Sequence, residues 1–394
     1  MNGCKKMKQL NVGMIGYQFM GKAHSNAWLK TPLFFDAKYK PVLKAVCGRH
    51  KEPLQAFADR WGWQEVETDW RKIIERDDID IIDIVAPTYL HHDIVIQAAQ
   101  AGKHIFCEKP LALNFKQAQE MYQAVKDAGI IHYLNHNYRK CPAILLAKQL
   151  IDQGKLGTIF HWKGEYLQDW IVDPNFPLTW HLKKETAGSG SHNDLNSHSV
   201  DLARFLVGDI KSVTAMTTNF VKERPLPDDT GEGAFNSKTQ RQETGEVTVD
   251  DASFMLTEFA NGALGSFQAS RFALGRKNYN RFEIYGSKGS IVFNLERMNE
   301  LQYFSKEDPK FCQGFRTILA TESCHPYISS WWPPGHIIGY EHEFVHSTYE
   351  FLNAIAQNKL PEPNIYDGLK VMQILDAGLE SAKIGQKINI EPII

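Results

Sequence analysis

The sequence of 394 residues lacks a long apolar run and lacks a strong charge of one sign. Its uncharged apolar stretches all fall short of the roughly 20 residues that a membrane-spanning helix needs. The formal net charge is -2, so the chain has no basic excess of the kind that nucleic-acid-binding proteins carry. These absences predict a protein that binds neither nucleic acid nor a membrane.

Cysteine is scarce and scattered. The six cysteines, at positions 4, 47, 107, 141, 312 and 324, form no C-x-x-C pair and no zinc-finger spacing. The N-terminal segment runs directly into a strand-like stretch, without the apolar region or cleavage site of a secretion signal. We therefore expect a soluble protein of the reducing cytoplasm. No metal is predicted, because no other segment adds an obvious ligand to His192, Asp194 and His198.

Short apolar runs alternate with amphipathic segments over the first 140 residues. The runs at 10–16, 41–48, 79–87, 103–110 and 130–139 predict strands, and the segments between them predict helices. This alternation is typical of an α/β fold with a doubly wound parallel sheet, which we assign to residues 7–139. Ligands of such sheets bind at the carboxyl ends of the strands.

The pattern of apolar and polar residues changes after residue 140. Alternating or β-rich runs at 158–170, 211–221, 250–273 and 280–294 surround one predicted helix at 197–208. They predict a second, α+β domain over residues 140–394, with an open and largely antiparallel sheet. Two helices are expected at 343–358 and 367–385, where they could pack back on the first domain. The polar, glycine-rich segment 222–246 predicts a long exposed loop.

A glycine loop joins the first predicted strand to the first predicted helix. It reads Gly16-Tyr17-Gln18-Phe19-Met20-Gly21, so a glutamine stands where a dinucleotide loop has its middle glycine. Gly16 suits a tight turn, and Gly21 suits close packing of the helix on the strand. Taken alone, the loop fits a nucleotide site and an ordinary strand-to-helix turn equally well. Gln18 would have to contact the phosphate itself or turn away.

The second predicted strand ends without the acidic residue that would bind the ribose hydroxyls. The chain reads Cys47-Gly48-Arg49 there. Arg49 could meet a 2′-phosphate or stack on adenine, and it could equally be a solvated surface residue. NAD and NADP both remain open at this point.

Two polar groups further along the chain fit proton transfer and charge stabilisation. Glu108 and Lys109 end a predicted strand at the ligand edge of the sheet, although a surface ion pair would also fit. Asp194 and His198 are four residues apart and would share one face of a helix. A histidine beside a carboxylate suits proton transfer near neutral pH. A helix cap and a buried structural histidine are the alternatives.

Together these segments resemble the Gfo/Idh/MocA oxidoreductases, a family that includes glucose–fructose oxidoreductase and inositol dehydrogenase. The matching segments are GYQFMGKAH, APTYLHHDIVIQAAQAGKHIFCEKPLA, NYR at 137–139, GSGSHNDLNSHSVDLARFL and FEIYGSKGSI. They cover nearly the whole chain. The segments YLQDW and HIIGYEHEFVHSTYEFLNAI are similar to the members that act on sugars and glycosides.

The resemblance implies a Rossmann domain that binds NAD or NADP, with NAD favoured, and a homo-oligomer, a dimer or a tetramer. It implies Lys109, Asp194 and His198 as the catalytic residues. It also implies cofactor contacts from Gly16, Gln18, Phe19, Met20, Gly21, Gly48, Arg49, Pro87, Thr88, His91, Glu108, Lys109 and Asn137. The expected activity is hydride transfer between nicotinamide and a secondary hydroxyl of a sugar, glycoside or polyol ring, with carbon 3 as a candidate position.

Substrate contacts are expected from the segment after residue 160 and from the catalytic group. Strand alternation puts Trp162, Tyr166, Gln168 and Trp170 on one face, where aromatic rings suit sugar C–H surfaces. Gln168 and Asp169 can read hydroxyl groups. A core or an oligomer interface would explain the two tryptophans equally well.

Two rival functions are compatible with these residues. One is an NADPH-dependent anhydrosugar or carbonyl reductase, which Arg49 favours. The other is a non-catalytic regulator that senses a dinucleotide. Lys109, Asp194 and His198 together favour an enzyme over a sensor, because a sensor needs no proton-transfer group.

Overall fold

The structure is a computed structural model, and it describes residues 8–228 and 243–393. The chain divides into two compact units, and it passes from the first to the second between Asn137 and Tyr138. The segment Tyr340–Leu369 returns to the first unit, and Lys370–Ile394 belongs to the second. In the described ranges, no helix is both long and apolar enough to cross a membrane.

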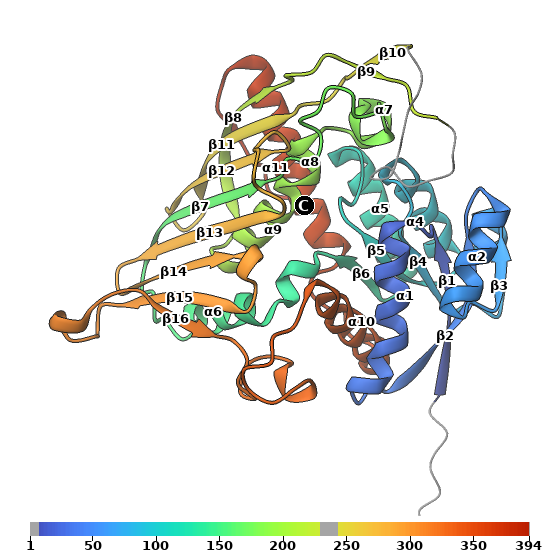
Figure 1. The fold of residues 1–394 in the computed structure, drawn as a ribbon, viewed down its shortest axis with the longest axis horizontal. Coiled ribbons are helices and arrows are strands. Elements are labelled where there is room, and N and C mark those ends of the chain that lie inside the picture. The colour runs from blue at the N-terminus through green and yellow to red at the C-terminus, as the bar shows by residue number, and fades with distance from the viewer. Residues whose placement is uncertain (1–7, 229–242, 394) are drawn as a thin grey trace, which may run out of the picture. The chain divides into compact units, whose positions relative to one another are not determined.

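The first unit contains a six-stranded sheet in the order β3-β2-β1-β4-β5-β6 (Figure 1). All of its strand pairs are parallel. The strands are β1 (Lys8–Ile15), β2 (Tyr39–Cys47), β3 (Glu65–Glu67), β4 (Ile81–Ile84), β5 (His104–Glu108) and β6 (His132–Asn135). The doubly wound α/β prediction is thereby confirmed, and β1 lies at the centre, where the strand order reverses.

Helices pack against this sheet and form a hydrophobic core with it. They are α1 (Phe19–Phe34), α2 (Lys51–Trp61), α3 (Trp70–Ile74), α4 (His91–Gln100), α5 (Phe115–Ala128) and α10 (Tyr340–Gln357). Helix α1 packs against α10, and α4 packs against α5. Trp28 of α1 and Phe351 of α10 meet Phe106 of β5 in a buried aromatic cluster. The C-terminal segment Tyr340–Leu369 therefore completes the core of the first unit.

The second unit contains a nine-stranded sheet in the order β16-β15-β14-β13-β7-β12-β11-β8-β17. Its pairs are antiparallel except β7 with β12, so the prediction of a largely antiparallel sheet is confirmed. The strands are β7 (Ile159–Leu167), β8 (Ile210–Thr218), β11 (Ala252–Phe259), β12 (Leu264–Ser270), β13 (Tyr279–Gly286), β14 (Gly289–Asn294), β15 (Glu300–Ser305), β16 (Arg316–Leu319) and β17 (Ile388–Asn389).

Helices pack against one face of the nine-stranded sheet. They are α6 (Pro142–Asp152), α8 (Ser191–Asp194), α9 (Asn196–Leu206) and the second-unit part of α11 (Ile365–Ile384), while α7 (Lys184–Ala187) lies in a connection (Figure 1). Trp162 points into this layer, where it stacks on Phe282 at 5.0 Å between ring centroids. Trp162 is therefore a core residue, as one of its two sequence-based interpretations had it.

Two predicted elements differ from the structure. The segment 222–246, expected as a loop, lies largely outside the described residues, but its ends pair as an antiparallel ladder between β9 (Glu223–Pro225) and β10 (Thr244–Glu246). The helix expected at 197–208 is preceded by a separate short helix. The helical hydrogen-bonding pattern is interrupted at Leu195, so Asp194 ends α8 and His198 belongs to α9.

Candidate functional site

The glycine loop follows β1 and brings its backbone against β4. Gly16 has a φ of +108°, a backbone conformation that residues other than glycine rarely adopt. A Cβ atom there would lie 2.7 Å from the carbonyl oxygen of Val85. The Gly16 N–H donates to the Cys47 carbonyl at 2.9 Å. Gly16 is therefore fixed by three neighbouring strand ends, as the tight turn of a dinucleotide loop requires.

The N-terminus of α1 carries no side-chain cap. Gln18 occupies the cap position without a capping hydrogen bond from its side chain, and the first turn contains no acidic residue. A Cβ atom on Gly21 would approach the Gly16 carbonyl oxygen to 3.3 Å, so the loop and helix pack closely. The N–H groups of a first helical turn, together with the positive end of the helix dipole, bind anions well. These residues fit the pyrophosphate of a dinucleotide, with Gln18 exposed beside it.

A tyrosine ring covers the position where an acidic residue was expected. The Tyr17 ring lies against Gly48, and a Cβ atom at residue 48 would clash with the ring carbons Cδ1 and Cε1. Tyr17 also packs edge-on against Phe57, with 5.9 Å between ring centroids. Arg49, the next residue, is exposed. The missing acid at residue 48 therefore has a steric cause, which is the position of the Tyr17 ring.

The residues after β4 lie inside the fold. Thr88 is 4% exposed, and His91 is 1% exposed. The Nε2 atom of His91 lies 2.9 Å from the Ala86 carbonyl oxygen, and Nδ1 lies 3.1 Å from that of Pro110. Burial lowers the pKa of His91. The ring thus ties the turn after β4 to the turn after β5, while Pro87 caps a short 3₁₀ helix, Thr88–Leu90.

Glu108 ends β5, and its carboxylate turns inward. Its Oε1 atom accepts hydrogen bonds from His24 at 2.8 Å and from Asn135 at 2.6 Å, while Oε2 accepts from the Lys109 N–H at 3.2 Å. Burial opposes ionisation of Glu108, but the hydrogen bond and charge of His24 outweigh it and lower the pKa. Glu108 therefore holds the turn that carries Lys109, whose own side chain is half-buried.

Three further candidate cofactor residues are Asn137, Phe19 and Met20. Asn137 is buried, and its side-chain amide donates to the Glu343 carboxylate of α10 at 2.9 Å. Phe19 at the start of α1 is half-exposed and stacks on the Tyr340 ring at 6.3 Å between centroids. Met20 is partly buried beside it. Helix α10 thus contacts Asn137 and Phe19.

In the second unit, Asp250 anchors the short helix that ends at Asp194. Its carboxylate accepts hydrogen bonds from the Ser189 hydroxyl, from the Gly190 N–H at 2.8 Å and from the His192 N–H at 2.8 Å. A Cβ atom on Gly190 would clash with the Asp250 carbonyl oxygen. The glycine allows this close approach, and the carboxylate satisfies N–H groups that the start of a helix leaves unpaired.

Asp194 forms an ion pair that the sequence did not reveal. The Arg271 guanidinium donates to its Oδ2 atom at 2.8 Å, and Arg271 is 1% exposed. The same guanidinium lies over the Trp170 ring, 5.3 Å from the centroid. An ion pair of a buried arginine with a partly exposed carboxylate fixes the direction of that carboxylate. This arrangement is a better description of Asp194 than a helix cap.

His198 lies against two tyrosine rings that form one hydrogen-bonded group. Its ring centroid is 4.4 Å from that of Tyr138 and 5.8 Å from that of Tyr166. The two tyrosine hydroxyls are 2.9 Å apart, and the Tyr166 hydroxyl donates to Asn278 Oδ1 at 2.6 Å. The group continues from Asn278 to Gln168 at 3.0 Å and on to Trp170 at 2.9 Å.

We call this set the tyrosine–amide cluster; it consists of Tyr138, Tyr166, Gln168, Trp170, Asn278 and His198. Four of its members were predicted from the sequence. Tyr138 and Asn278 were missed, and so was Arg271 nearby. Their partners lie far away along the chain, so spacing gives no signal for them. Tyr138 alone had a clue, since it falls within the NYR segment.

Two other polar candidates point elsewhere. Asp169 accepts from the Gly275 N–H at 3.1 Å and from Lys277 Nζ at 2.8 Å, so it holds the loop before β13 and the structure does not bring it into the tyrosine–amide cluster. The ring nitrogens of His192 lie 2.8 Å from the Ser253 hydroxyl and 2.8 Å from the Leu375 carbonyl oxygen. His192 therefore connects α8 with β11 and α11.

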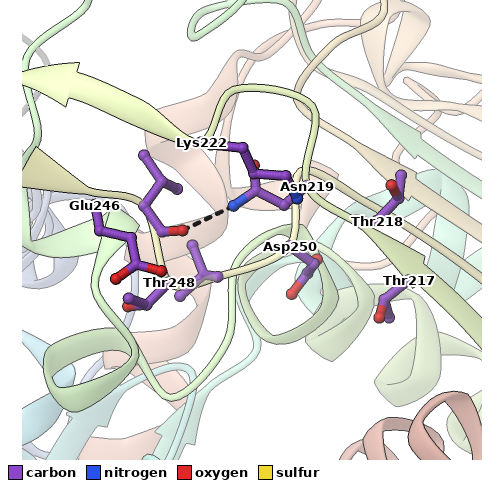
Figure 2. Close-up of a pocket in the computed structure, with 9 residues that line it drawn as sticks. Thr217, Thr218, Asn219, Lys222, Glu246, Thr248 and Asp250 are labelled. Carbon is purple, nitrogen blue, oxygen red and sulfur yellow. Dashed lines mark hydrogen bonds between the residues drawn. The ribbon is translucent and has the colours of Figure 1, made fainter.

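A shallow polar depression lies at the end of β8. Figure 2 shows Asn219, Lys222, Glu246 and Thr248 around it, with the Asn219 amide donating to the Val247 carbonyl at 2.8 Å. Asp250 is on its rim but directs its carboxylate toward α8. None of the predicted site residues lines this depression.

Comparison with known proteins gives consistent matches over both units. Residues 10–136 match the family model "Oxidoreductase family, NAD-binding Rossmann fold", and residues 144–292 match "GFO/IDH/MocA C-terminal domain". A levoglucosan dehydrogenase of Pseudarthrobacter phenanthrenivorans is 44% identical over 98% of this chain and all of its own length.

Solved structures agree with this result. An oxidoreductase domain protein from Kribbella flavida superposes with a TM-score of 0.92 at 46% identity, over 98% of this chain and 100% of that one. A levoglucosan dehydrogenase in complex with NADH and levoglucosan gives a TM-score of 0.92 at 43% identity over the same shares. The match of both units confirms the predicted family and the NAD-type cofactor. The chain belongs to the GFO/IDH/MocA family of NAD-binding oxidoreductases.

Proposed function

We propose that this chain is an NAD-dependent dehydrogenase that oxidises a secondary ring hydroxyl of a sugar or glycoside, with levoglucosan-like anhydrosugars as the first candidates. The observation that carries the proposal is the tyrosine–amide cluster around His198. It combines aromatic faces, hydroxyls and amides, which are the groups that recognise a polyhydroxylated ring. The 44% identity to a levoglucosan dehydrogenase supports the same substrate class.

In the proposed reaction, three side chains act on the hydroxyl that is oxidised. Bound NAD⁺ supplies the hydride acceptor. His198 takes the hydroxyl proton as a neutral imidazole, a role suited to histidine near neutral pH. Lys109 donates a hydrogen bond to the same oxygen and stabilises its developing negative charge. The products are a ring ketone, NADH and a proton.

Asp194 serves as a positioning and hydrogen-bonding group in this scheme. Its Oδ2 atom accepts from Arg271, and its side chain is 28% exposed, which lets a substrate hydroxyl approach the carboxylate. Because Arg271 is buried and stacked on Trp170, the direction of the carboxylate is fixed before substrate binds. A preorganised acceptor of this kind contributes to orientation rather than to proton removal.

The test is a panel of anhydrosugars, sugars and glycosides with NAD and NADP in parallel, read by absorbance of the reduced cofactor. We expect Lys109→Ala and His198→Ala each to lower turnover by about 10²-fold or more while NADH binding persists. Lys116→Ala and His92→Ala, on the surface of the first unit, serve as matched controls and should retain activity. Tight NADH binding without turnover on any sugar would instead favour a dinucleotide sensor.

One observation favours NADPH as the cofactor and reduction of a carbonyl as the direction of the reaction. Arg49 is exposed directly after Gly48, where it is suited to contact a 2′-phosphate. If the chain works as an NADPH-dependent reductase, the panel will show faster consumption of NADPH with a ketosugar than formation of NADH from the sugar. Arg49→Ala would then weaken NADPH binding selectively.

We also propose that the chain forms a homo-oligomer through the uncovered face of the nine-stranded sheet. Met216, Phe254, Leu256 and Leu264 are each more than half exposed on adjacent strands β8, β11 and β12. Contiguous apolar surface of this kind is typical of interaction sites. The proposed occupant is the same face of a second copy, since two such faces bury identical surfaces around a twofold axis. The cytoplasmic setting stays a prediction; the described cysteines are free.

A further inference from the structure

A buried histidine links helix α1 to β5, the strand that ends directly before Lys109. His24 lies three residues after Gly21 on α1, and its side chain is fully buried. Its Nδ1 atom lies 2.8 Å from Asp83 Oδ1 on β4, and its Nε2 atom lies 2.8 Å from Glu108 Oε1 on β5. We call these three side chains the His24 clamp.

Both ring nitrogens of His24 face a carboxylate oxygen at 2.8 Å, a geometry that fits two donors, and the Asn135 amide nitrogen lies further from Nε2, at 3.4 Å. A neutral imidazole has one N–H and one lone pair, so one of its nitrogens would direct a lone pair at a carboxylate oxygen. An imidazolium donates to both carboxylates. Each carboxylate also accepts a second hydrogen bond: Glu108 Oε1 accepts from Asn135, and Asp83 Oδ2 accepts from Trp28.

The charges around His24 agree with this state. Burial alone would lower the pKa of His24, but the charge and hydrogen bond of Asp83, together with those of Glu108, outweigh it and raise the pKa to about 10. The other faces of the ring meet Phe106 of β5 and Phe344 of α10, which carry no charge. The charge of Lys109 also acts on Glu108 and favours its ionised form.

The clamp reaches Lys109 through the backbone. Glu108 Oε1 is held by His24 and Asn135, which leaves Oε2 to accept the Lys109 N–H at 3.2 Å. The direction of the Glu108 carboxylate therefore sets the orientation of the Lys109 peptide unit. The geometry points to His24 as a positioning residue that, as an imidazolium between Asp83 and Glu108, holds Lys109 in its catalytic orientation. Through these hydrogen bonds the position of Lys109 also depends on helix α1, which carries His24.

This inference rests on the proposed dehydrogenase function for its kinetic test. His24→Asn removes the charge and one of the two contacts. Asp83→Asn keeps the shape of the buried side chain while removing the charge opposite His24, and it serves if His24→Asn does not fold. Trp28→Phe is the matched control, because it removes the other hydrogen bond of Asp83 and leaves Glu108 untouched.

We expect His24→Asn and Asp83→Asn to lower kcat by about tenfold or more, with KM for sugar and NAD changed less than about threefold. In Asp83→Asn, kcat should also fall as pH rises from about 7 toward 10, because His24 without its stronger partner loses its proton in that range. Trp28→Phe should lose stability and keep kcat within about twofold of wild type.

A readout without turnover separates this inference from the proposed function. Acylation of Lys109 in the NADH complex, quantified by peptide mass spectrometry against Lys116, reports the accessibility and reactivity of the amine, which a change in its orientation alters. A change of about threefold or more in His24→Asn, absent in Trp28→Phe, supports the positioning role even if no sugar is oxidised by the wild-type protein. Wild-type kcat or labelling in both clamp variants, or losses equal to those of Trp28→Phe, would overturn it.

Discussion

The Tyr17 ring leaves no room for a side chain at residue 48, where dinucleotide-binding proteins often have an acidic residue. The ring of Tyr17 occupies the space in which a side chain at residue 48 would begin. An aspartate at this position would have been the usual indicator of NAD, and its absence left the cofactor open at the level of sequence. The glycine is thus a packing requirement of the loop that also carries Gly16 and Gln18.

Gly48→Ala should weaken cofactor binding. The added methyl group clashes with the Tyr17 ring, so the ring and the adjacent Gly16 turn must shift. We expect the Kd for NADH, measured by fluorescence titration, to rise by about tenfold, which corresponds to about 1.4 kcal/mol. Gly314→Ala is the control, because no atom lies within 4 Å of a Cβ there. An unchanged Kd in Gly48→Ala would show that the ring moves without cost to the loop.

The His24 clamp should make stability depend on pH on the alkaline side. The folded-state pKa of His24 is about 10, raised from an ordinary value of 6.5. Its stabilising contribution is therefore fully present below about pH 6.5 and is lost as pH rises through about 10. Urea unfolding of the wild type should show a falling free energy of unfolding between these values. His24→Asn should flatten that slope, and an unaltered slope would argue against an ionised His24.

At the scale of elements, the position of Asp194 depends on how α8 begins. Gly190 and Asp250 together hold the first turn of this four-residue helix. A helix so short has little stability of its own, so its position comes from these contacts.

Gly190→Ala should displace α8 and with it Asp194. The new methyl group clashes with the Asp250 carbonyl, and overpacking of this kind costs about 1–3 kcal/mol. We expect a lower midpoint in urea unfolding and reduced kcat/KM for the sugar, with NADH binding retained. Gly314→Ala again supplies the comparison. If Gly190→Ala kept full stability and kcat/KM, the anchoring role of this turn would be wrong.

The sequence predicted five of the six strands in the sheet of the first unit because their signals are local, and it missed the short elements β3 and α3. Apolar runs such as 103–110 end in a proline or glycine, and the parallel α/β pattern repeats. The break at Leu195 was missed, since Asp194 and His198 have the spacing of one helix. Arg271 and Asn278 were missed for another reason. Their partners Asp194 and Tyr166 are brought near by the sheet of the second unit, a long-range effect that no local pattern records.

At the scale of the whole molecule, the proposed homo-oligomer interface on the uncovered sheet face can be tested by one substitution. Leu256→Lys places a charge in the centre of the apolar strip on β8, β11 and β12. We expect this variant to dissociate to a monomer in sedimentation velocity, because burying an unpaired lysine in an interface costs several kcal/mol. Leu274→Lys, on an exposed leucine after β12, should leave the assembly intact. A wild-type monomer, or an unaffected Leu256→Lys oligomer, would exclude this face.

The mixed pairing of β7 has a consequence for the synthesis of the protein. β7 (Ile159–Leu167) pairs with β12 on one side and with β13 on the other, and both strands come much later in the chain. A nascent chain that has just emerged through residue 167 therefore exposes two unpaired strand edges together with Trp162. Such edges are prone to association, and pairings of long sequence separation form slowly. The sheet of the second unit should thus form only after β13 has been synthesised, and its yield should respond to growth temperature.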